Sequence, residues 1–529
     1  MEKQEIINEF LKKNFLVSPD IFNLENFQIL EFLKEKLEIK TTVINKDILL
    51  NSFEQEFDWV VFENSRVLLE KGRNQEDYFQ IIKSLTRSEV VLKEADQIMK
   101  TNFKVISNFT RVVDKKIVIQ DFVEYFKSRY RSIREILLKR PELQDVISIS
   151  KALNKKDKDN VTIIGLVANK VLTKNDNFIF EIEDLTGIIK VIVGKKDKEL
   201  YDTCKEIMLD ETLGVIGSFS KGILFGRRMI FPDIPLTKEL KKCSDDVYLI
   251  CTSDIHVGSR LFHRKEFLKF IEWVNGNFGD EKQVEIAKKV KYILIPGDLV
   301  AGVGVYPGQD KELEIKDIYD QYKELANLLS KIRKDIKIIL CPGDHDAVMV
   351  YEPQPILDKD FSKPLYELEN IYLVNNPSLV NIHSSEDFEG FNCLIYHGHS
   401  FIYYADNVEH IRGNGWTARG DLIMKYLLQR RHLSPTHSAT LYLPEAKSDP
   451  LIIDTVPDFF ISGHLHQVSN LLYRNVSLVG CGCWEGLTPY QQKTGNKADP
   501  CKVTLINLKN REVKILNFLK SEEEVLEAF

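Results

Sequence analysis

Residues 336–353 read IKIILCPGDHDAVMVYEP. An apolar run over residues 336–340 ends in a turn, residues 341–346, that holds a proline, a glycine, two aspartates and a histidine. A short apolar run bounded by proline and glycine is typical of a buried strand. Ionisable side chains directly after such a strand indicate either an ordinary polar loop or a reaction centre at the end of a sheet.

The same arrangement recurs after four other apolar runs, which favours the reaction centre. The runs 247–253, 290–296, 391–396 and 458–462 lead to Asp254 and His256, to Asp298, to His397, and to His464 and His466. Because the ends of neighbouring strands meet at one edge of a sheet, we expect all five sets to converge there. His399 competes with His397 for this role, and we prefer His397 because it directly follows the strand.

The residue types predict a metal centre. Imidazoles and carboxylates without a thiolate suit a borderline divalent ion such as Mn²⁺, Fe²⁺ or Zn²⁺. Seven candidate ligands are too many for one tetrahedral ion, whereas two ions that share a carboxylate need about this number. Such a pair can clamp a phosphate and activate a water. We assign ordinary core or surface roles to the other histidines: His263, His383, His410, His432 and His437.

The bulk composition is that of a globular protein with several domains. The chain has 529 residues, of which 43% are hydrophobic and 29% charged, so we expect two to four domains. It has eight cysteines without a C-x-x-C pair and no signal-like or membrane-spanning apolar run, so we expect a cytoplasmic protein. A net charge of −7 argues against a general nucleic-acid binder.

The pattern of apolar residues predicts four regions. Helical periodicity predicts a small helical N-terminal domain over 1–72, followed by a linker and helical region over 73–155. Residues 156–238 contain five strand-like runs with a helix after the third, which matches a β-barrel OB-fold, a module that binds oligonucleotides or proteins. Residues 245–520 alternate short apolar runs with helical stretches and are predicted to be α/β.

Two features outside these motifs have alternative interpretations. A helix ending before Pro141 has one apolar face and one basic face; the apolar residues are Phe122, Phe126, Tyr130, Ile133 and Leu137, and the basic ones Arg129, Arg131 and Arg134. We expect the basic face to be solvated, with contact to DNA or a partner as the alternative. Tyr403, Tyr404 and Trp416 are expected to pack, with stacking on an unpaired base as the alternative.

The ordered motifs D-x-H, G-D, G-D-H-D, H and G-H-x-H resemble those of the calcineurin-like metallophosphoesterases. This resemblance implies an α/β two-sheet sandwich with flanking helices. The preceding barrel and the phrases TSDIHVGSR, PGDLV, YPGQD, RRHLSP and GHLH are similar to the small subunits of archaeal DNA polymerase D, also called DNA polymerase II. The fold class is therefore expected to be multidomain, with the sandwich preceded by the OB-fold and the helical N-terminal domain.

The resemblance also implies roles for the residues. One metal ion would be held by Asp254, His256 and His466, and the second by Asp344, His397 and His464, with Asp298 bridging them. His345 would be the uncoordinated catalytic histidine of a 3′-to-5′ proofreading exonuclease. The implied cofactors are two divalent ions, with Mn²⁺ preferred over Fe²⁺ or Zn²⁺. The implied partners are a large catalytic polymerase subunit and the single-stranded 3′ end of DNA, with no membrane.

Two positions depart from the family pattern. Asp344 stands where the family usually has asparagine, and Ala301 stands where G-D-x-x-D supplies an aspartate that orients the catalytic histidine. One hypothesis is an enzyme whose chemical step is slowed, unless another carboxylate such as Asp346 replaces the missing one. The second hypothesis is a catalytically weakened scaffold subunit. The third is a free-standing phosphatase, which would leave the barrel without a role.

Overall fold

The computed structural model describes residues 103–107, 117–444, 449–520 and 525–528, together with two short strands, β1 (Leu16–Val17) and β2 (Val43–Ile44). β1 and β2 pair in parallel, and the prediction of a helical domain over 1–72 did not include them. The rest of that prediction lies outside the described residues. Residues 94–529 form one compact unit, which contains every feature discussed below.

The first of two large sheets has seven strands, of which the four at one side are parallel. Its order is β12 (Ile371–Leu373), β11 (Lys337–Cys341), β10 (Val290–Pro296), β9 (Tyr248–Cys251), β18 (Lys502–Asn507), β19 (Val513–Asn517) and β20 (Leu526–Ala528). β9 to β12 run parallel and β18 to β20 are antiparallel. Strands β9 and β11 are apolar almost throughout because both faces of the sheet are covered.

The second sheet has six strands and includes one from far upstream in the chain. Its order is β16 (Ser469–Tyr473), β17 (Val476–Gly480), β15 (Phe459–Ser462), β14 (Phe391–Ile395), β13 (Ser378–Ile382) and β3 (Phe103–Ser107). β3 pairs antiparallel with β13 at the edge of the sheet. The predicted range 245–520 leaves out this strand, because a five-residue segment carries no sign of which distant sheet it joins.

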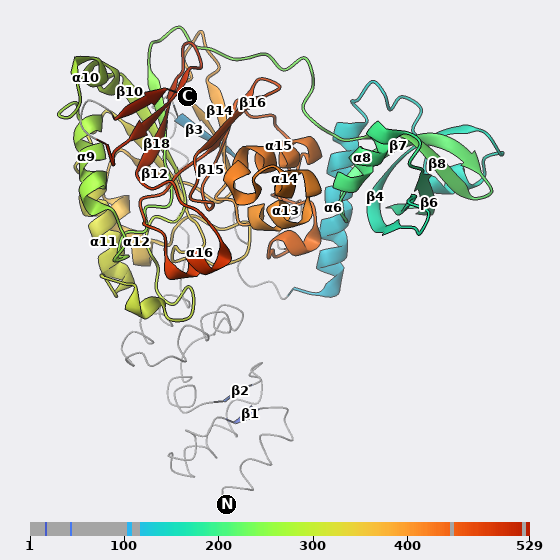
Figure 1. The fold of residues 1–529 in the computed structure, drawn as a ribbon, viewed down its shortest axis with the longest axis horizontal. Helices are drawn as coiled ribbons and strands as arrows, with labels where there is room; N and C mark the ends of the chain where they lie inside the picture. Colours follow the sequence, from blue (N-terminus) through green and yellow to red (C-terminus); the bar gives the residue numbers. More distant parts are fainter. Residues whose placement is uncertain are drawn as a thin grey trace, which may run out of the picture. The chain divides into compact units, whose positions relative to one another are not determined.

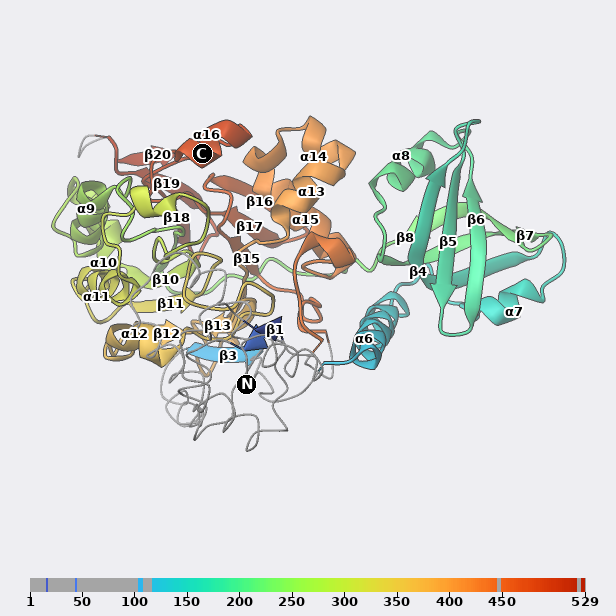
Figure 2. The ribbon, with the colours of Figure 1, turned by 90° about the horizontal axis from the view of Figure 1, so that it is seen from below.

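The two sheets pack face to face, and helices cover their outer faces (Figures 1 and 2). Leu249, Leu294, Ile395 and Ile461 belong to the core between the sheets. The seven-stranded sheet is covered by α9 (Arg264–Val274), α10 (Glu281–Lys288), α11 (Ile318–Leu329) and α12 (Lys359–Tyr366). The six-stranded sheet is covered by α13 (Phe401–Asn407), α14 (Glu409–Gly413) and α15 (Gly420–Arg430). The short helices η3 (Gln309–Lys311), η4 (Trp416–Arg419), η5 (His437–Ala439) and α16 (Pro489–Thr494) lie in the connections. The expected two-sheet sandwich is present.

A closed five-stranded barrel precedes the sandwich in the chain. Its order is β4 (Asn160–Leu172), β5 (Phe178–Asp184), β6 (Gly187–Val193), β8 (Ile223–Ile230) and β7 (Thr212–Ser220). Two helices accompany it: α7 (Ile149–Leu153), and α8 (Lys198–Glu206) between the third and fourth strands. Alternate residues of β5 point into the barrel core, as its buried Phe178, Phe180 and Ile182 indicate.

Helix α6 (Ile119–Leu137) differs from its prediction in which residues it buries. The buried side chains are Tyr125, Arg129, Tyr130, Ile133 and Leu137, so Arg129 does not belong to a solvated basic face. Phe122 and Phe126 are only partly buried. The correction has a physical reason: a carboxylate from another part of the chain neutralises Arg129, and periodicity within a helix cannot reveal such a partner.

Two buried ion pairs, which we call the seam, join the barrel and α6 to the two-sheet sandwich. Arg129 Nε donates to Asp449 Oδ2 at 2.5 Å, and Asp449 also accepts from Tyr125 Oη at 2.7 Å. Arg430 Nε of α15 donates at 3.1 Å to Glu211 Oε1, which precedes β7 of the barrel. All four charged side chains are less than a tenth exposed, so each pair replaces lost hydration with its partner's charge.

All eight cysteines are buried and unpaired. Burial raises the pKa of Cys204 to about 12, which keeps it a thiol near neutral pH. Within the described ranges, no helix combines the length and the apolar character needed to cross a membrane.

Candidate metal centre

The seven predicted ligands and His345 all lie just beyond the carboxyl ends of five strands. Asp254, Asp298 and Asp344 follow β9, β10 and β11 of the seven-stranded sheet. His397 and His464 follow β14 and β15 of the other sheet. The candidate ligands therefore follow strands, as predicted. They do not converge at the end of a single sheet, because strands of both packed sheets contribute them.

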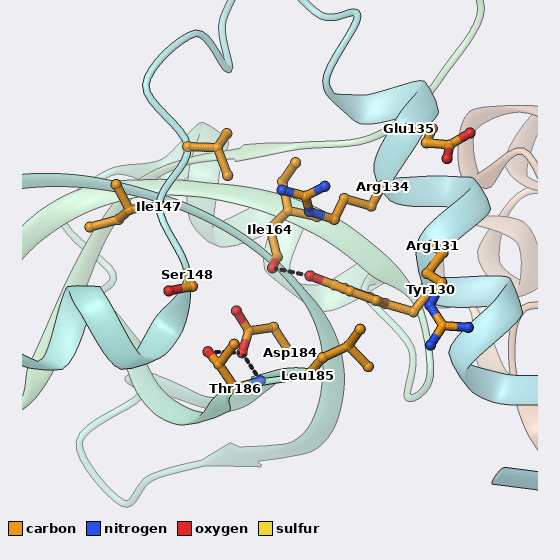
Figure 3. A pocket seen from close by; sticks show the side chains of 11 residues that line it. Tyr130, Arg131, Arg134, Glu135, Ile147, Ser148, Ile164, Asp184, Leu185 and Thr186 are labelled. Atoms are coloured by element: carbon orange, nitrogen blue, oxygen red, sulfur yellow. Dashed lines mark hydrogen bonds between the residues drawn. The ribbon is translucent and has the colours of Figure 1, made fainter. Parts of the chain in front are cut away.

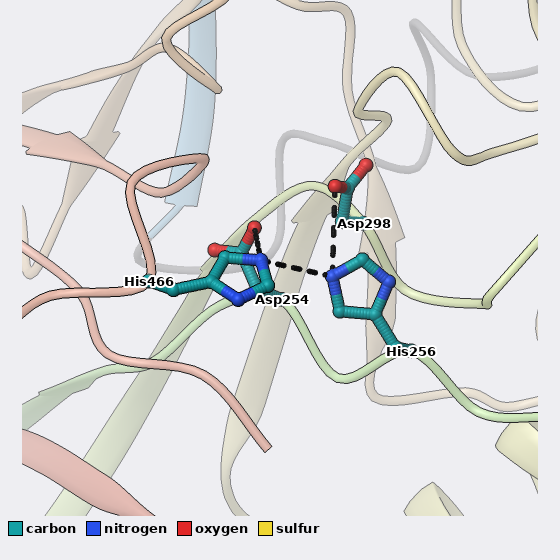
Figure 4. Close-up of side chains that lie close together, drawn as sticks. All are labelled: Asp254, His256, Asp298 and His466. Carbon is teal, nitrogen blue, oxygen red and sulfur yellow. Dashed lines mark hydrogen bonds and ion pairs between the residues drawn. The ribbon is translucent and has the colours of Figure 1, made fainter. Parts of the chain in front are cut away.

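The first group contains Asp254, His256, Asp298 and His466, whose potential ligand atoms lie within 4.8 Å of one another (Figure 4). His256 Nε2 and His466 Nε2 face each other at 3.1 Å. His466 Nε2 lies 3.3 Å from Asp254 Oδ1, and His256 Nε2 lies 3.7 Å from Asp298 Oδ2. All four residues are buried, so water does not compensate for their polar atoms.

The second group contains Asp344, His397 and His464. Asp344 Oδ1 lies 2.7 Å from His397 Nε2 and 3.2 Å from His464 Nδ1. Asp298 Oδ2 lies 3.5 Å from His397 Nε2, so the same carboxylate reaches both groups. This is the place that the prediction gave Asp298, between two triads of ligands.

The chemistry of this donor set fits divalent cations. The ligand atoms are oxygens and imidazole nitrogens, and the ring nitrogens of His256 and His466 meet at 3.1 Å, where one must carry a proton to donate to the other. Burial lowers the pKa of His256 well below its usual range, and His345 adds to this, which favours the neutral imidazole that metals bind. A cation among the ring nitrogens and carboxylates would take the place of such a proton.

His397 and Asp344 have a different charge state. Burial opposes the charged form of His397, but Asp298 and Asp344 more than compensate and raise its pKa well above its usual range. Burial likewise opposes ionisation of Asp344, yet His464 and His397 hold its pKa well below the usual range. His397 therefore holds the proton and Asp344 is ionised, so binding of a metal ion through His397 Nε2 must release that proton.

Five of the seven ligands have a strained backbone. Asp254, His256, Asp298, His464 and His466 have φ values of 51°, 53°, 51°, 67° and 57°. Residues other than glycine rarely adopt this left-handed region, and each such residue costs about 1–3 kcal/mol. Five strained residues among the candidate ligands of one centre are expected where the positions of functional side chains determine the backbone conformation.

The glycines of the motifs are required by close approach of the ligands. A Cβ on Gly343 would lie 2.3 Å from Asp298 Oδ1, and one on Gly463 would lie 2.5 Å from Asp254 Oδ2. Any side chain at either position would displace a carboxylate of the centre. In the G-D-H and G-H motifs, the glycine therefore leaves room for a carboxylate from another strand end, and the next residues supply candidate ligands.

His345 forms a third group of potential ligands with Asp298 and Asp344, and its imidazole lies against a backbone oxygen. Its Nδ1 lies 2.9 Å from the carbonyl oxygen of Ala301, and its backbone N–H donates to Asp298 Oδ1 at 2.9 Å. Asp346 does not replace the missing aspartate. Its Oδ2 accepts from the backbone N–H groups of Gly343 at 2.8 Å and Leu299 at 3.2 Å, and burial raises its pKa to about 7.

Sequence reasoning missed Glu485, which faces the same centre. Its Oε2 lies 4.0 Å from His256 Nε2, and the residue is only 5% exposed. Burial raises the pKa of Glu485, and the positive charge of His466 opposes this. Glu485 lies five residues beyond β17, so a strand-end signal existed, but no histidine or aspartate motif accompanied it.

Other residues considered in the sequence take structural roles. His399 is not part of either ligand group among the described residues, and its ring centroid is 6.0 Å from that of His464. Tyr404 is buried and its Oη accepts the N–H of Thr436 at 3.0 Å, so it packs as expected. Trp416 Nε1 donates to Asp406 Oδ1 at 2.6 Å.

A separate cavity of about 280 Å³ lies between α6 and the barrel (Figure 3). Arg131, Arg134, Ser148 and Asp184 are among its lining residues, and none of the predicted ligands is. Asp184 already accepts hydrogen bonds from Thr186. This cavity is therefore separate from the predicted metal ligands, which lie at the strand ends.

Comparison with known proteins supports the interpretation of these strand-end residues as a candidate metal centre. The calcineurin-like phosphoesterase family model matches residues 248–468, which contain every predicted ligand. The DNA polymerase II small subunit of Methanothermobacter thermautotrophicus is 39% identical over 392 residues, 74% of this chain and 78% of the relative. The chain belongs to the family of archaeal DNA polymerase II small subunits.

Two other family members give the same picture. The small subunit of Archaeoglobus fulgidus is 35% identical over 402 residues, covering 76% of this chain and 78% of the relative. That of Pyrococcus furiosus is 39% identical over 406 residues, which cover 76% of this chain but only 64% of the relative. The family resemblance noted in the sequence is thus confirmed over about three quarters of the chain.

Proposed function

We propose that this small subunit is a metal-dependent 3′-to-5′ exonuclease that removes mispaired nucleotides for a large catalytic subunit of DNA polymerase II. The observation that carries the proposal is the position of Asp298, whose Oδ2 lies 3.7 Å from His256 Nε2 and 3.5 Å from His397 Nε2. A carboxylate shared by two ligand triads is the arrangement required by a pair of ions that acts on phosphodiesters.

The two ions, for which we propose Mn²⁺, with Fe²⁺ or Zn²⁺ as alternatives, would polarise the phosphoryl oxygens and activate a water. Asp254, His256 and His466 would hold one ion, and Asp344, His397 and His464 the other, with Asp298 between them. His345 is the proposed general acid. Its Nδ1 faces the Ala301 carbonyl, so Nε2 is the atom that can give a proton to the departing 3′ oxygen.

Asp344 tunes the site in two opposing ways. His464 and His397 overcome the effect of burial and keep the pKa of Asp344 low, so this position carries a full negative charge that an asparagine would lack. The charge strengthens cation binding, but it raises the electrostatic cost of bringing in a phosphate. We therefore expect tight metal binding combined with slower chemistry.

The barrel and the remaining regions have proposed roles of their own. The strand order β4-β5-β6-β8-β7, with α8 after the third strand, supports an OB-fold over about 156–238 that contacts the large subunit or single-stranded DNA. We propose the sandwich, 245–520 with β3 added, as the exonuclease domain, 73–155 as the connecting region, 1–72 as a separate domain, and the cytoplasm as the location.

A catalytically weakened scaffold is the second candidate. Ala301 and Asp344 favour it, and so does the seam, because two buried ion pairs that fix the barrel to the sandwich suit a subunit that holds a polymerase together. Retention of a metal-capable side chain at all seven ligand positions favours the enzyme. Activity of the assembled complex separates the two candidates.

The test uses the purified chain with its large subunit, loaded with Mn²⁺, on DNA with a mispaired 3′ end. We expect removal of the terminal nucleotide, and a loss of about 10²- to 10⁴-fold in kcat for His345→Ala at unchanged metal content. His399→Ala is the matched control and should keep full activity. Intact 3′ ends with the metal-loaded wild-type complex would favour the scaffold, and turnover of a small phosphomonoester without DNA would favour a phosphatase.

A further inference from the structure

The missing aspartate at position 301 leaves His345 without a side chain to orient it. In this structure its Nδ1 is 2.9 Å from the backbone oxygen of Ala301. A carbonyl oxygen can only accept, so Nδ1 must carry the proton, and the lone pair or the transferable proton is left on Nε2. The carbonyl oxygen can do this only if the loop around Ala301 keeps one conformation.

One buried side chain fixes that carbonyl. Gln309 Nε2 donates to the oxygen of Ala301 at 2.7 Å, and Gln309 Oε1 accepts the N–H of Val305 at 2.9 Å. The amide thus bonds both ends of the turn 301–305, and Gln309 is only 2% exposed. A buried amide that satisfies two backbone groups is costly to lose, because each group would be left without a partner.

A second buried glutamine holds the neighbouring peptide and provides an internal control. Gln321 Oε1 accepts the N–H of Gly302 at 2.9 Å, and its Nε2 donates to the oxygen of Gly302 at 3.1 Å. A Cβ on Gly302 would lie 2.2 Å from the backbone oxygen of His345, so this loop presses against the histidine. Gln321 stabilises the same loop but makes no hydrogen bond to the Ala301 oxygen that His345 uses.

We propose that Gln309 is the positioning residue that replaces the missing aspartate: it holds the Ala301 carbonyl oxygen against Nδ1 of His345 and so directs Nε2 toward the metal centre. The two lone pairs of that oxygen serve Gln309 and His345 together. The catalytic meaning of this arrangement rests on the proposed exonuclease function, whereas the tautomer of His345 does not.

The tautomer is measured by NMR of the full chain labelled with ¹⁵N-histidine, with His345→Gln used to assign the His345 signals. We expect the wild-type imidazole to be protonated at Nδ1, and Gln309→Met to give a mixture of tautomers. Gln321→Met, which loosens the same loop, should leave the tautomer as in wild type. A wild-type imidazole protonated at Nε2, or equal effects of Gln309→Met and Gln321→Met, would overturn the proposal.

Kinetics of the metal-loaded complex test the consequence for catalysis. Gln309→Met should lower kcat by roughly ten- to a hundredfold with KM unchanged, since misdirected proton transfer affects only the chemical step. In an Ala301→Asp background the new carboxylate can hold Nδ1 itself, so the same substitution should cost less than about twofold. Additive losses in the double variant would refute the positioning role.

The melting temperatures of Gln309→Met and Gln321→Met guard against misfolding, because each variant removes a buried amide from the same loop and should lose a similar amount of stability. Only Gln309→Met should combine that loss with the lower kcat and the tautomer mixture. If the chain has no exonuclease activity, every kinetic value vanishes together while the tautomer measurement still decides the positioning claim. The two failures are therefore distinguishable.

Discussion

The metal centre and the seam both bury charged residues, but they differ in whether those charges compensate one another. In the seam, Asp449 meets Arg129 at 2.5 Å and Glu211 meets Arg430 at 3.1 Å, so each carboxylate has a guanidinium. In the centre, the described carboxylates lie against imidazoles and backbone N–H groups, and none of them pairs with a lysine or an arginine. Burial of charge therefore does not identify a functional site, whereas buried carboxylates without a permanent cation do.

Removing the shared carboxylate should have the largest effect on the metal centre. We expect Asp298→Asn to lose about 10⁴-fold in kcat/KM, or about 5 kcal/mol, because the amide cannot neutralise two cations at once. Calorimetric titration of the metal-free variant with Mn²⁺ should detect fewer than two ions per chain. The melting temperature of the wild type should fall on chelation, whereas that of Asp298→Asn should barely change. Wild-type stoichiometry in the variant would remove Asp298 from the bridging role.

Breaking the seam should affect stability and leave the metal centre intact. Arg129→Met leaves Asp449 buried with Tyr125 and His432 but no permanent cation, which should cost about 3–5 kcal/mol in the free energy of unfolding. The double variant Arg129→Met/Asp449→Leu should recover only part of this loss, because it removes the unpaired charge but leaves Tyr125 Oη, His432 Nε2 and the Leu451 N–H without their acceptor. Urea unfolding measures both, and Mn²⁺ content serves as the control. A single variant as stable as the wild type would contradict a compensated seam.

The pH dependence sharpens the comparison further. Burial opposes ionisation of Asp449, but Arg129 and His432 hold its pKa well below the unfolded value of about 3.9. The unfolded chain therefore takes up this proton first as pH falls, and the stabilisation, complete above about pH 5, is lost below that, by up to about 1.4 kcal/mol per pH unit. Unfolding free energies at pH 5 and pH 3 should differ less for Arg129→Met than for the wild type. An equal difference would exclude Asp449 as the source.

Substitution of Glu485 should weaken metal binding less than substitution of Asp298. The Glu485 carboxylate is 4.0 Å from His256 Nε2, close enough to stabilise positive charge, but Glu485 belongs to none of the ligand groups found among the described residues. We expect Glu485→Gln to weaken Mn²⁺ binding by only about three- to tenfold, within the range of residues that support ligands. Equilibrium titration measures this, with Asp298→Asn for comparison. A loss as large as that of Asp298→Asn would make Glu485 a ligand.

Much of the candidate site could be predicted because its signals are local. Each ligand follows an apolar run directly, and β9, β10, β11, β14 and β15 are where those runs predicted strands. Glu485 had no such motif, and the burial of Arg129 depends on a carboxylate 320 residues away in sequence. Periodicity shows which face of a helix or strand is apolar. It does not show whether a charged residue from a distant segment will neutralise a polar face and allow it to be buried.

The amino-acid sequence alone predicted the family, the order in which candidate ligands follow strands and the side chains proposed to hold two cations, because each of these is encoded within a few consecutive residues. The folded structure was needed to show that the candidate ligands come from two sheets, that β3 completes one of them, and that the Ala301 carbonyl oxygen lies against His345. Those features depend on contacts between segments far apart in the chain, and such contacts are set by packing of the whole domain rather than by local pattern.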